Sequence, residues 1–548
     1  MGTRRTLVAA MAAVALLATA CGDDDDGTTA PQTTASGGAS TTAAATSAPT
    51  TAEPTPEDDY CTEERKGGTL TVGEPAYASG LDPGQTTGAA GTTGGLQMTA
   101  LFDTLMRWNG AEGVYEPQVA ESLEPNADAS VWTLKLRPNV KFGNGDPLDS
   151  AAVIASIERL GTTRVSGGSF VSFITNMEPV DPLTVRFTLN SPWGDFPYFL
   201  AAVGGMIVNV KVLNSMTPEQ FNLNPAGAGV GPYELERFAP QEEVILRAKD
   251  DYWGGPVCIE RIRIIRPQGH QALYDALKLG EIDLTLFAGN PVFTRRVIDE
   301  GFPGFGEVSQ ALQLMINTRP GQPGENVDIR RAIAAAIDID LINQRVYDGT
   351  GNFATTIVPP DSPLATPGVE GTKYDPELAK RLVAEAKAQG WDGKILLNYG
   401  ETSAEEALAV EALLKAAGMD PQVTLLATAD LVNRVINEKN FQVTSWSLNV
   451  LPGAPWSGID RNLNSQSPTN RTAFADPDFD AGLAKLRAAS TTEAKAAAIA
   501  ELQRVWNDKV PGVLMRQDLE RLTWNENVHG VKPTREAVAM LDKAWIEQ

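Results

Sequence analysis

Histidine is nearly absent from this sequence, which has only His270 and His529 among 548 residues, and cysteine occurs three times. Zinc sites made of several histidines or cysteines, and acid–base catalysis by histidine, therefore have almost no residues to draw on. We expect no catalytic residue, no metal site and no cofactor. The composition argues against an enzyme.

Positive charge is also in deficit. Lys and Arg total 45 whereas Asp and Glu total 69, which gives a net charge of −24. Such a surface repels phosphate backbones, so nucleic acid is not an expected partner. The length and the 42% of hydrophobic residues fit a globular protein with two or three domains.

A long apolar run is missing, since a membrane-spanning helix needs about 20 apolar residues. The run from Leu7 to Leu17 is shorter, follows Arg4 and Arg5, and leads into small residues before Cys21. This pattern predicts a secretory signal peptide over residues 1–20.

The five residues that end in Cys21 resemble the lipobox of bacterial lipoproteins, in which the signal is cut before the Cys and its thiol receives diacylglycerol. Ala18 departs from the pattern, because the family prefers Leu there. The resemblance implies lipidation at Cys21 and an extracytoplasmic protein anchored to the cell membrane. The alternative is a plain secretory signal followed by an incidental Cys.

Residues 22–59 contain no Leu, Ile, Val, Met or aromatic residue. Such a segment cannot bury enough apolar surface to order itself, so we predict a disordered tether over residues 21–60. Two thiols remain beyond it, Cys61 and Cys258. In an oxidising exterior they either form a disulfide or stay as separate thiols.

Short strand patterns alternate with helical ones from Gly67 onward. Helices are predicted after Asp149, Asp328 and Asp375, which are suited to cap a first turn. The apolar faces that follow are Val153, Ile157 and Leu160; Ile329, Ile333 and Ile337; and Leu378 and Leu382. The expected strands are Thr69 to Val72, then Trp132 to Leu136, then Val185 to Leu189.

A strand, helix, strand unit is predicted over Lys394 to Leu397, Glu405 to Ala417 and Gln422 to Leu426. Because the whole unit is about 30 residues long, it implies parallel pairing with a right-handed crossover. The predicted fold class is therefore α/β.

The order of short motifs resembles the family 5 solute-binding proteins of ABC importers, the oligopeptide, dipeptide and nickel class. The motifs stand in family order over nearly all of residues 67–532. They are Leu101 to Leu105, Val131 to Phe142, Gly145 to Leu148, Gly229 to Tyr233, Asp251 to Gly254, Gly280 to Asp283, Asn317, Ile329 to Asp338, and Tyr374 to Pro376. Val230 replaces the usual Thr.

The resemblance implies a two-lobed periplasmic-binding-protein-like fold (class II) with an extra subdomain in lobe one. Lobe one would span residues 61–268 and 514–548, with the subdomain at about residues 100–225, and lobe two would span residues 269–513. It also implies a monomer that encloses a solute between its lobes and delivers it to ABC permease subunits.

Ligand contacts are carried over from the family onto two segments. The loop after the first strand supplies Tyr77, Ala78 and Ser79, and a late segment of lobe two supplies Trp446, Ser447 and Asn449; core packing is the alternative for the two aromatics. Trp456 and Arg461 are added because their Gly/Pro-rich neighbourhood is typical of a loop, although Arg461 alternatively is a solvated surface charge.

Asn449 stands where peptide-binding members of the family carry an aspartate that pairs with the peptide α-amino group. An amide does not supply that charge-assisted bond. Peptide is the first expectation for the solute. The alternatives are a nickel chelate, an opine or an oligosaccharide, a sensor that reports its solute, and a hydrolase that uses two carboxylates distant in sequence.

Overall fold

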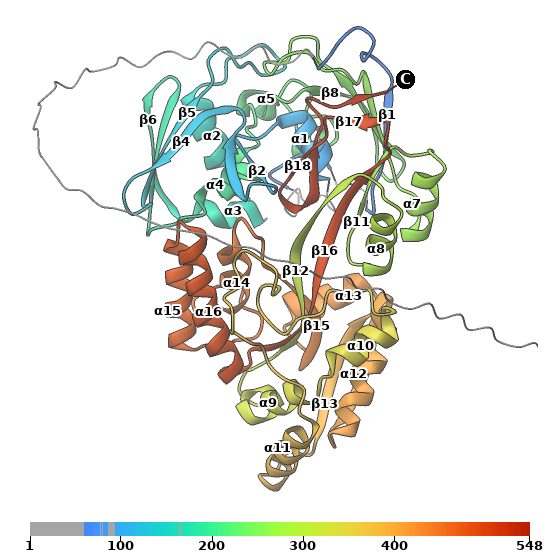
Figure 1. The fold of residues 1–548 in the computed structure, drawn as a ribbon. Helices are drawn as coiled ribbons and strands as arrows, with labels where there is room; N and C mark the ends of the chain where they lie inside the picture. Colours follow the sequence, from blue (N-terminus) through green and yellow to red (C-terminus); the bar gives the residue numbers. More distant parts are fainter. Residues whose placement is uncertain (1–59, 77, 79, 86–93, 164–165, 548) are drawn as a thin grey trace, which may run out of the picture. The chain divides into compact units, whose positions relative to one another are not determined.

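The computed structural model describes residues 60–76, 78, 80–85, 94–163 and 166–547. The predicted signal peptide, Cys21 and almost all of the predicted tether lie outside these residues. The described residues belong to one compact unit, Asp58–Gln548. Its mixture of strands and helices confirms the predicted α/β class (Figure 1).

A ten-stranded mixed sheet forms the framework of this unit. In spatial order its strands are β14 (Asp420–Leu426), β13 (Lys394–Gly400), β15 (Val443–Asn449), β12 (Gly304–Ile316), β16 (Gly512–Trp524), β11 (Leu284–Phe287), β1 (Thr69–Gly73), β10 (Arg261–Ile265), β9 (Glu243–Ala248) and β8 (Tyr233–Ala239). The parallel pair β13 and β14 with the helix between them confirms the predicted strand, helix, strand unit.

The remaining strands form smaller, separate sheets. A four-stranded antiparallel sheet has the order β4 (Ala120–Pro125), β5 (Val131–Leu136), β7 (Thr184–Leu189) and β6 (Ile174–Asp181). Three strand pairs join β2 (Met106–Asn109) to β3 (Val114–Pro117), β18 (Lys532–Thr534) to β19 (Val538–Met540), and β17 (Val528–His529) to β20 (Trp545–Ile546).

The helices in chain order are α1 (Gly95–Phe102), α2 (Ser150–Gly161), α3 (Ser166–Val171), α4 (Phe196–Ala201), α5 (Val210–Asn214), α6 (Pro218–Leu223), α7 (Gly269–Lys278), α8 (Pro291–Asp299), α9 (Val327–Ala336), α10 (Ile339–Val346), α11 (Pro376–Ala388), α12 (Ala404–Ala416), α13 (Thr428–Val432), α14 (Pro455–Leu463), α15 (Pro477–Ala488) and α16 (Thr492–Lys509). A π-helical turn, η5 (Asn433–Asn437), follows α13, and a 3-10 turn, η6 (Arg535–Ala537), precedes β19.

Two of the three predicted helix caps are confirmed. The Asp149 side chain accepts a hydrogen bond from the N–H of Ala152, and Asp375 accepts one from Leu378. The prediction of a cap at Asp328 is wrong, because α9 already begins at Val327. The capping residue is Asn326, whose side chain accepts a hydrogen bond from the Asp328 N–H. Asp328 instead lies in the first turn, where its charge faces the positive end of the helix dipole.

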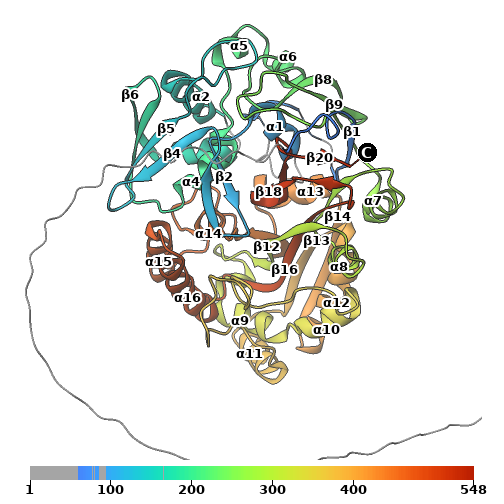
Figure 2. The ribbon, with the colours of Figure 1, turned by 45° about the horizontal axis from the view of Figure 1, so that its top comes forward.

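Strands β12 and β16 are the longest of the framework, with 13 residues each. They pair with each other from Gly304 to Met315 and so connect the β15 side of the sheet to the β1 side, as Figures 1 and 2 show. Strand β11 pairs with β1 of the predicted lobe one. The predicted boundary at residue 268 would instead place β11 in lobe two. The lobe boundaries stay a prediction.

Candidate functional site

The loop after β1 carries the first predicted contacts. Tyr77 and Ser79 lie outside the described residues, and Ala78 is buried. Just before this loop, Glu74 is 5% exposed and accepts a hydrogen bond of 2.8 Å from the Gln97 amide. Burial raises the pKa of Glu74 to about 8, against the opposing effect of this bond. The carboxyl group is therefore mostly protonated at neutral pH.

Strand register separates the predicted contacts on β15. Asn449 pairs with Gln310 of β12, and Ser447 pairs with Leu312. Side chains alternate between the faces of a strand, so these four residues share one face and Trp446 lies on the other. All four are half-buried. That face therefore retains access to solvent.

Trp446 is packed on its own face. The guanidinium carbon of Arg471 lies 5.3 Å from the Trp446 ring centre, and Arg471 donates to the side-chain oxygen of Asn462 at 2.8 Å. Burial lowers the pKa of Arg471 to about 10, and the nearby charge of Arg461 adds to the effect. The Trp446 ring is thus held by a cation–π contact from within the protein.

Strand β15 has an edge that is only partly paired. On the side away from β12, its ladder with β13 consists of Leu397 opposite Val443 and Asn398 opposite Thr444. Among the described residues, no strand pairs with this side of Ser445–Leu448. We call these four residues the open edge. In an antiparallel ladder alternate residues direct both N–H and C=O away from the partner strand, so the open edge presents main-chain groups that no other described strand pairs. The Ser445 carbonyl accepts a hydrogen bond from the Thr444 hydroxyl at 3.4 Å.

The prediction that Trp456 lies in a loop is wrong. Pro455 occupies the first turn of α14, where its missing N–H costs nothing, and Trp456 follows it within the helix. The Trp456 side chain is 3% exposed, and its ring centre lies 5.5 Å from that of Phe173 and 5.8 Å from that of Trp193. The structure thus places Trp456 in a buried aromatic cluster with Phe173 and Trp193 and not on an exposed loop.

Arg461 is also in α14. It is half-buried, and its Nε has no hydrogen-bond partner among the residues that the structure describes. The main-chain oxygen of Arg461 accepts hydrogen bonds from Ser467 and Thr469. These contacts hold the helix end, and solute contact by Arg461 stays a prediction.

A charged network that the sequence did not reveal adjoins the open edge. Arg516 on β16 is 6% exposed and donates from Nε to Asp518 at 2.7 Å, while its Nη1 lies 3.6 Å from Glu406 of α12. Glu406 accepts hydrogen bonds from Tyr347 at 2.7 Å and from Ser445 at 3.3 Å. The network links β16 to the first residue of the open edge. Its members are separated by up to 171 residues, which no local motif signals.

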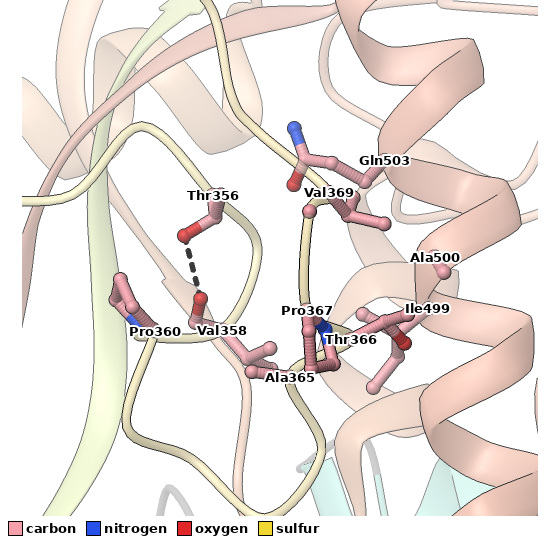
Figure 3. Close-up of a pocket in the computed structure, with 11 residues that line it drawn as sticks. Thr356, Val358, Pro360, Ala365, Thr366, Pro367, Val369, Ile499, Ala500 and Gln503 are labelled. Carbon is pink, nitrogen blue, oxygen red and sulfur yellow. Dashed lines mark hydrogen bonds between the residues drawn. The ribbon is translucent and has the colours of Figure 1, made fainter.

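A separate cavity of about 270 Å³ lies between residues 356–369 and α16 (Figure 3). Its polar groups are already engaged: Gln503 accepts from the Ile357 N–H and donates to Asn507, and Thr356 donates to the carbonyl of Val358. The polar side chains of the lining thus already have partners within the protein, which leaves mainly apolar side chains to face a solute.

No group of three or more His, Cys, Asp or Glu side chains that could hold a metal occurs in the part of the chain that the structure describes. Cys61 and Cys258 are joined by a disulfide. None of the helices within the described ranges has the length and apolar character needed to cross a membrane.

Comparisons with known proteins agree with this architecture. Residues 114–470 match the family model of bacterial extracellular solute-binding proteins, family 5 Middle. The dipeptide-binding protein of Escherichia coli is 27% identical over 327 residues, which cover 54% of this chain and only 59% of that protein. The di/tripeptide-binding protein 2 of Pseudomonas aeruginosa is 24% identical over 85% of this chain and 92% of that protein.

A similar solved structure is an ABC transporter-associated periplasmic binding protein from Helicobacter pylori in complex with the peptide STSA. It superposes with a TM-score of 0.73 at 20% identity and covers 88% of this chain and 99% of that one. This likeness supports the predicted two-lobed fold.

Proposed function

The chain belongs to the bacterial extracellular solute-binding proteins of family 5, and on this basis we propose that it captures a peptide between two lobes and delivers it to ABC permease subunits for import. The protein releases the solute unchanged. The observation that carries the proposal is the open edge of β15, Ser445–Leu448.

An extended peptide is the ligand that fits an unpaired strand edge. Its main chain adds as a further strand, so main-chain hydrogen bonds supply affinity whatever its sequence. The half-buried Ser447 and Asn449 then lie beside the bound chain, on the face that they share with Gln310. We propose these two as contacts, together with Tyr77, Ala78 and Ser79. We propose Arg461 as a further contact, whereas Trp446 and Trp456 pack within the protein.

Closure of the lobes explains how binding becomes a signal to the permease. A solute that contacts both lobes favours the closed state, and only this differential affinity shifts the equilibrium. We propose that β12 and β16 are the crossing strands, because they alone of the ten strands join the β15 side to the β1 side. Lobe one then extends to about residue 303, beyond the predicted boundary at 268, since β11 pairs with β1.

The cellular location of the protein is also part of the proposal. After cleavage of residues 1–20, lipidated Cys21 anchors a monomer on the outer side of the cell membrane, and residues 22–59 act as a tether. The unit then reaches a permease in the same membrane.

A non-peptide solute is the second candidate, and Asn449 favours it. An amide at this place does not provide the charge that a peptide ammonium group prefers. A nickel chelate, an opine or an oligosaccharide has no peptide α-amino group that needs a charged partner. A sensor role or a carboxylate-based hydrolase has no observation of its own in its favour.

A thermal-shift screen of the mature protein separates these candidates. Ligand at 100 times its dissociation constant stabilises the folded state by about 2.7 kcal/mol. Short peptides are expected to raise the melting temperature, whereas sugars, opines and metal chelates leave it unchanged. If only a non-peptide class raises it, the peptide proposal is wrong. Chemical conversion of the bound solute would reject the transport role.

A further inference from the structure

We infer that a second set of contacts, away from β12 and β16, holds the two proposed lobes together, and that Lys495 controls solute affinity through these contacts without touching the solute. This inference rests on the proposed closure of the lobes and adds the residues that control it. They are Asn190, Gly194 and Asp195 of lobe one with Trp456, Arg487 and Lys495 of lobe two. We call these six residues the latch.

A buried ion pair forms the centre of the latch. Asp195 immediately precedes α4 and is 2% exposed, and the Lys495 side chain in α16 is 15% exposed. The Asp195 Oδ1 and Lys495 Nζ atoms lie 2.5 Å apart. Burial raises the pKa of Asp195 to about 6, against the opposing effect of the Lys495 charge, so the carboxyl group is mostly ionised at neutral pH. A buried carboxylate needs such a partner, because burial of an unpaired charge is strongly unfavourable.

The main chains of the two proposed lobes touch beside this ion pair. The Gly194 N–H donates to the Arg487 carbonyl at 2.8 Å, and Arg487 donates from Nη2 to the Asn190 side-chain oxygen at 2.9 Å. A Cβ built on Gly194 would lie 2.1 Å from the Ala489 carbonyl oxygen, so this close approach requires glycine. The contact therefore depends on the backbone positions of both lobes and not only on long side chains.

Aromatic packing adds to the latch. Trp456 of lobe two lies against Phe173 and Trp193 of lobe one, with 5.5 Å and 5.8 Å between the ring centres, and Trp456 is 3% exposed. Separation of the lobes at this place would expose these rings to water, which the hydrophobic effect opposes. The latch thus favours the closed arrangement even before a solute binds.

The position of the latch decides what it controls. Figures 1 and 2 both show α15 and α16 below α4 and to the left of β12 and β16. A hinge at the crossing strands opens only if contacts away from the hinge separate, and the latch is such a contact. A solute that needs the closed arrangement has an apparent dissociation constant that rises as the closed fraction falls. The strength of the latch therefore contributes to solute affinity.

Lys495→Met tests the inference by small-angle X-ray scattering of the solute-free mature protein. In the closed arrangement of this variant Asp195 is buried without its partner, whereas in an open arrangement water hydrates it, so the variant should shift toward the open form. We expect its radius of gyration to exceed that of the unaltered protein by about 1 Å or more, against roughly 23 Å for a compact unit of this size. An unchanged radius in the folded variant overturns the latch.

Lys485→Met is the matched control. Lys485 in α15 forms an ion pair with Glu501 in α16, so both partners belong to lobe two, and their side chains are 60% and 45% exposed. This variant should scatter like the unaltered protein. An equal increase in radius for Lys485→Met and Lys495→Met would mean that loss of any lysine from these helices has the same effect, which also overturns the role of the latch.

Titration calorimetry with trialanine measures the consequence for binding. Lys495→Met should bind trialanine about fivefold or more weakly than the unaltered protein, whereas Lys485→Met should bind it equally well. Trialanine should also make the solute-free Lys495→Met protein more compact. Equal affinity of all three proteins overturns the effect of Lys495 on solute capture.

The same measurements separate a failure of the latch from a failure of the proposed function. If trialanine compacts the unaltered protein but Lys495→Met scatters like it, the latch is wrong and closure stands. If trialanine binds without changing the scattering of either protein, closure itself is wrong. If trialanine does not bind at all, the peptide proposal fails, and the comparison of the solute-free proteins still decides the latch.

Gly194→Ala provides a second variant in case Lys495→Met does not fold. The added methyl group must move away from the Ala489 carbonyl, so it should also raise the radius of gyration of the solute-free protein. Gly482→Ala in α15 is its control, because the Gly482 Cβ would meet the flexible Leu502 side chain at 2.8 Å within lobe two. The same radius for the two folded glycine variants contradicts the latch.

Discussion

The guanidinium carbon of Arg487, near the end of α15, lies 5.0 Å from the ring centre of Trp456 in α14. The same group lies 4.5 Å from the ring centre of Phe173, so one cation covers two aromatic rings. Because Trp456 is 3% exposed, Trp456→Ala leaves a large cavity. We expect the free energy of unfolding to fall by about 3 to 5 kcal/mol, measured by urea denaturation.

Trp391→Ala is the control for this substitution, because Trp391 is only half-buried. Its loss should be clearly smaller. Equal losses for the two variants would mean that the contact of α14 with Phe173 and Arg487 adds no stability beyond that of an ordinary half-buried ring.

The buried Glu74 predicts a pH dependence of stability. Its pKa is about 8 in the folded protein and about 4.5 when unfolded, so between these values the folded state holds a proton that the unfolded chain has lost. The free energy of unfolding therefore falls as the pH rises from 5 to 8, by up to about 1.4 kcal/mol per pH unit from this group. Glu74→Gln should make the fall less steep.

Chemical denaturation of both proteins at pH 5 to 8 measures this slope. The exposed Glu112 provides the control substitution, Glu112→Gln, which should leave the slope unchanged. Identical slopes in the Glu74→Gln and unaltered proteins would show that Glu74 ionises as freely in the folded state as in the unfolded one.

Asn449→Asp is expected to strengthen the binding of peptides with a free amino group. A carboxylate in place of the amide supplies a charge-assisted bond, so a roughly tenfold gain in affinity is expected for trialanine. The N-acetylated peptide, which has no ammonium group, should gain nothing. Calorimetry that shows no difference between the two peptides would remove Asn449 from the solute contacts.

The Cys61–Cys258 disulfide closes a loop with a sequence separation of 197 residues. A cross-link of this kind typically contributes about 2 to 4 kcal/mol. Reductant should therefore lower the melting temperature of the unaltered protein and leave a Cys61→Ser, Cys258→Ser variant unaffected. No effect of reductant on the unaltered protein would mean that the cross-link is absent in solution or adds no stability.

Periodicity and capping residues predicted much of the fold. The strand from Thr69, the helix after Asp149 and the parallel unit that starts at Lys394 depend on local patterns, and the structure contains all three. The misplaced cap at Asp328 shows the limit of such patterns. Asn326, two residues earlier, is an equally good capping residue, and only the path of the chain selects it.

The site could be predicted from the sequence less well than the fold, because its geometry arises from tertiary contacts. Pro455 and its glycine-rich surroundings are typical of a loop, yet the same proline starts a helix whose Trp456 packs on Phe173 from a distant part of the chain. The pairing of Arg516 with Glu406 likewise requires the sheet to be assembled. The open edge of β15 depends on where β13 stops pairing, which no composition or spacing reveals.

Amide hydrogen exchange of β15 tests the central claim most directly. The measurement compares exchange over residues 443–450 in the mature protein with and without saturating trialanine. If the peptide adds as a strand along Ser445–Leu448, alternate amides of this segment should exchange at least tenfold more slowly when it is bound. Saturation of the protein with trialanine without any change in this segment would contradict the account.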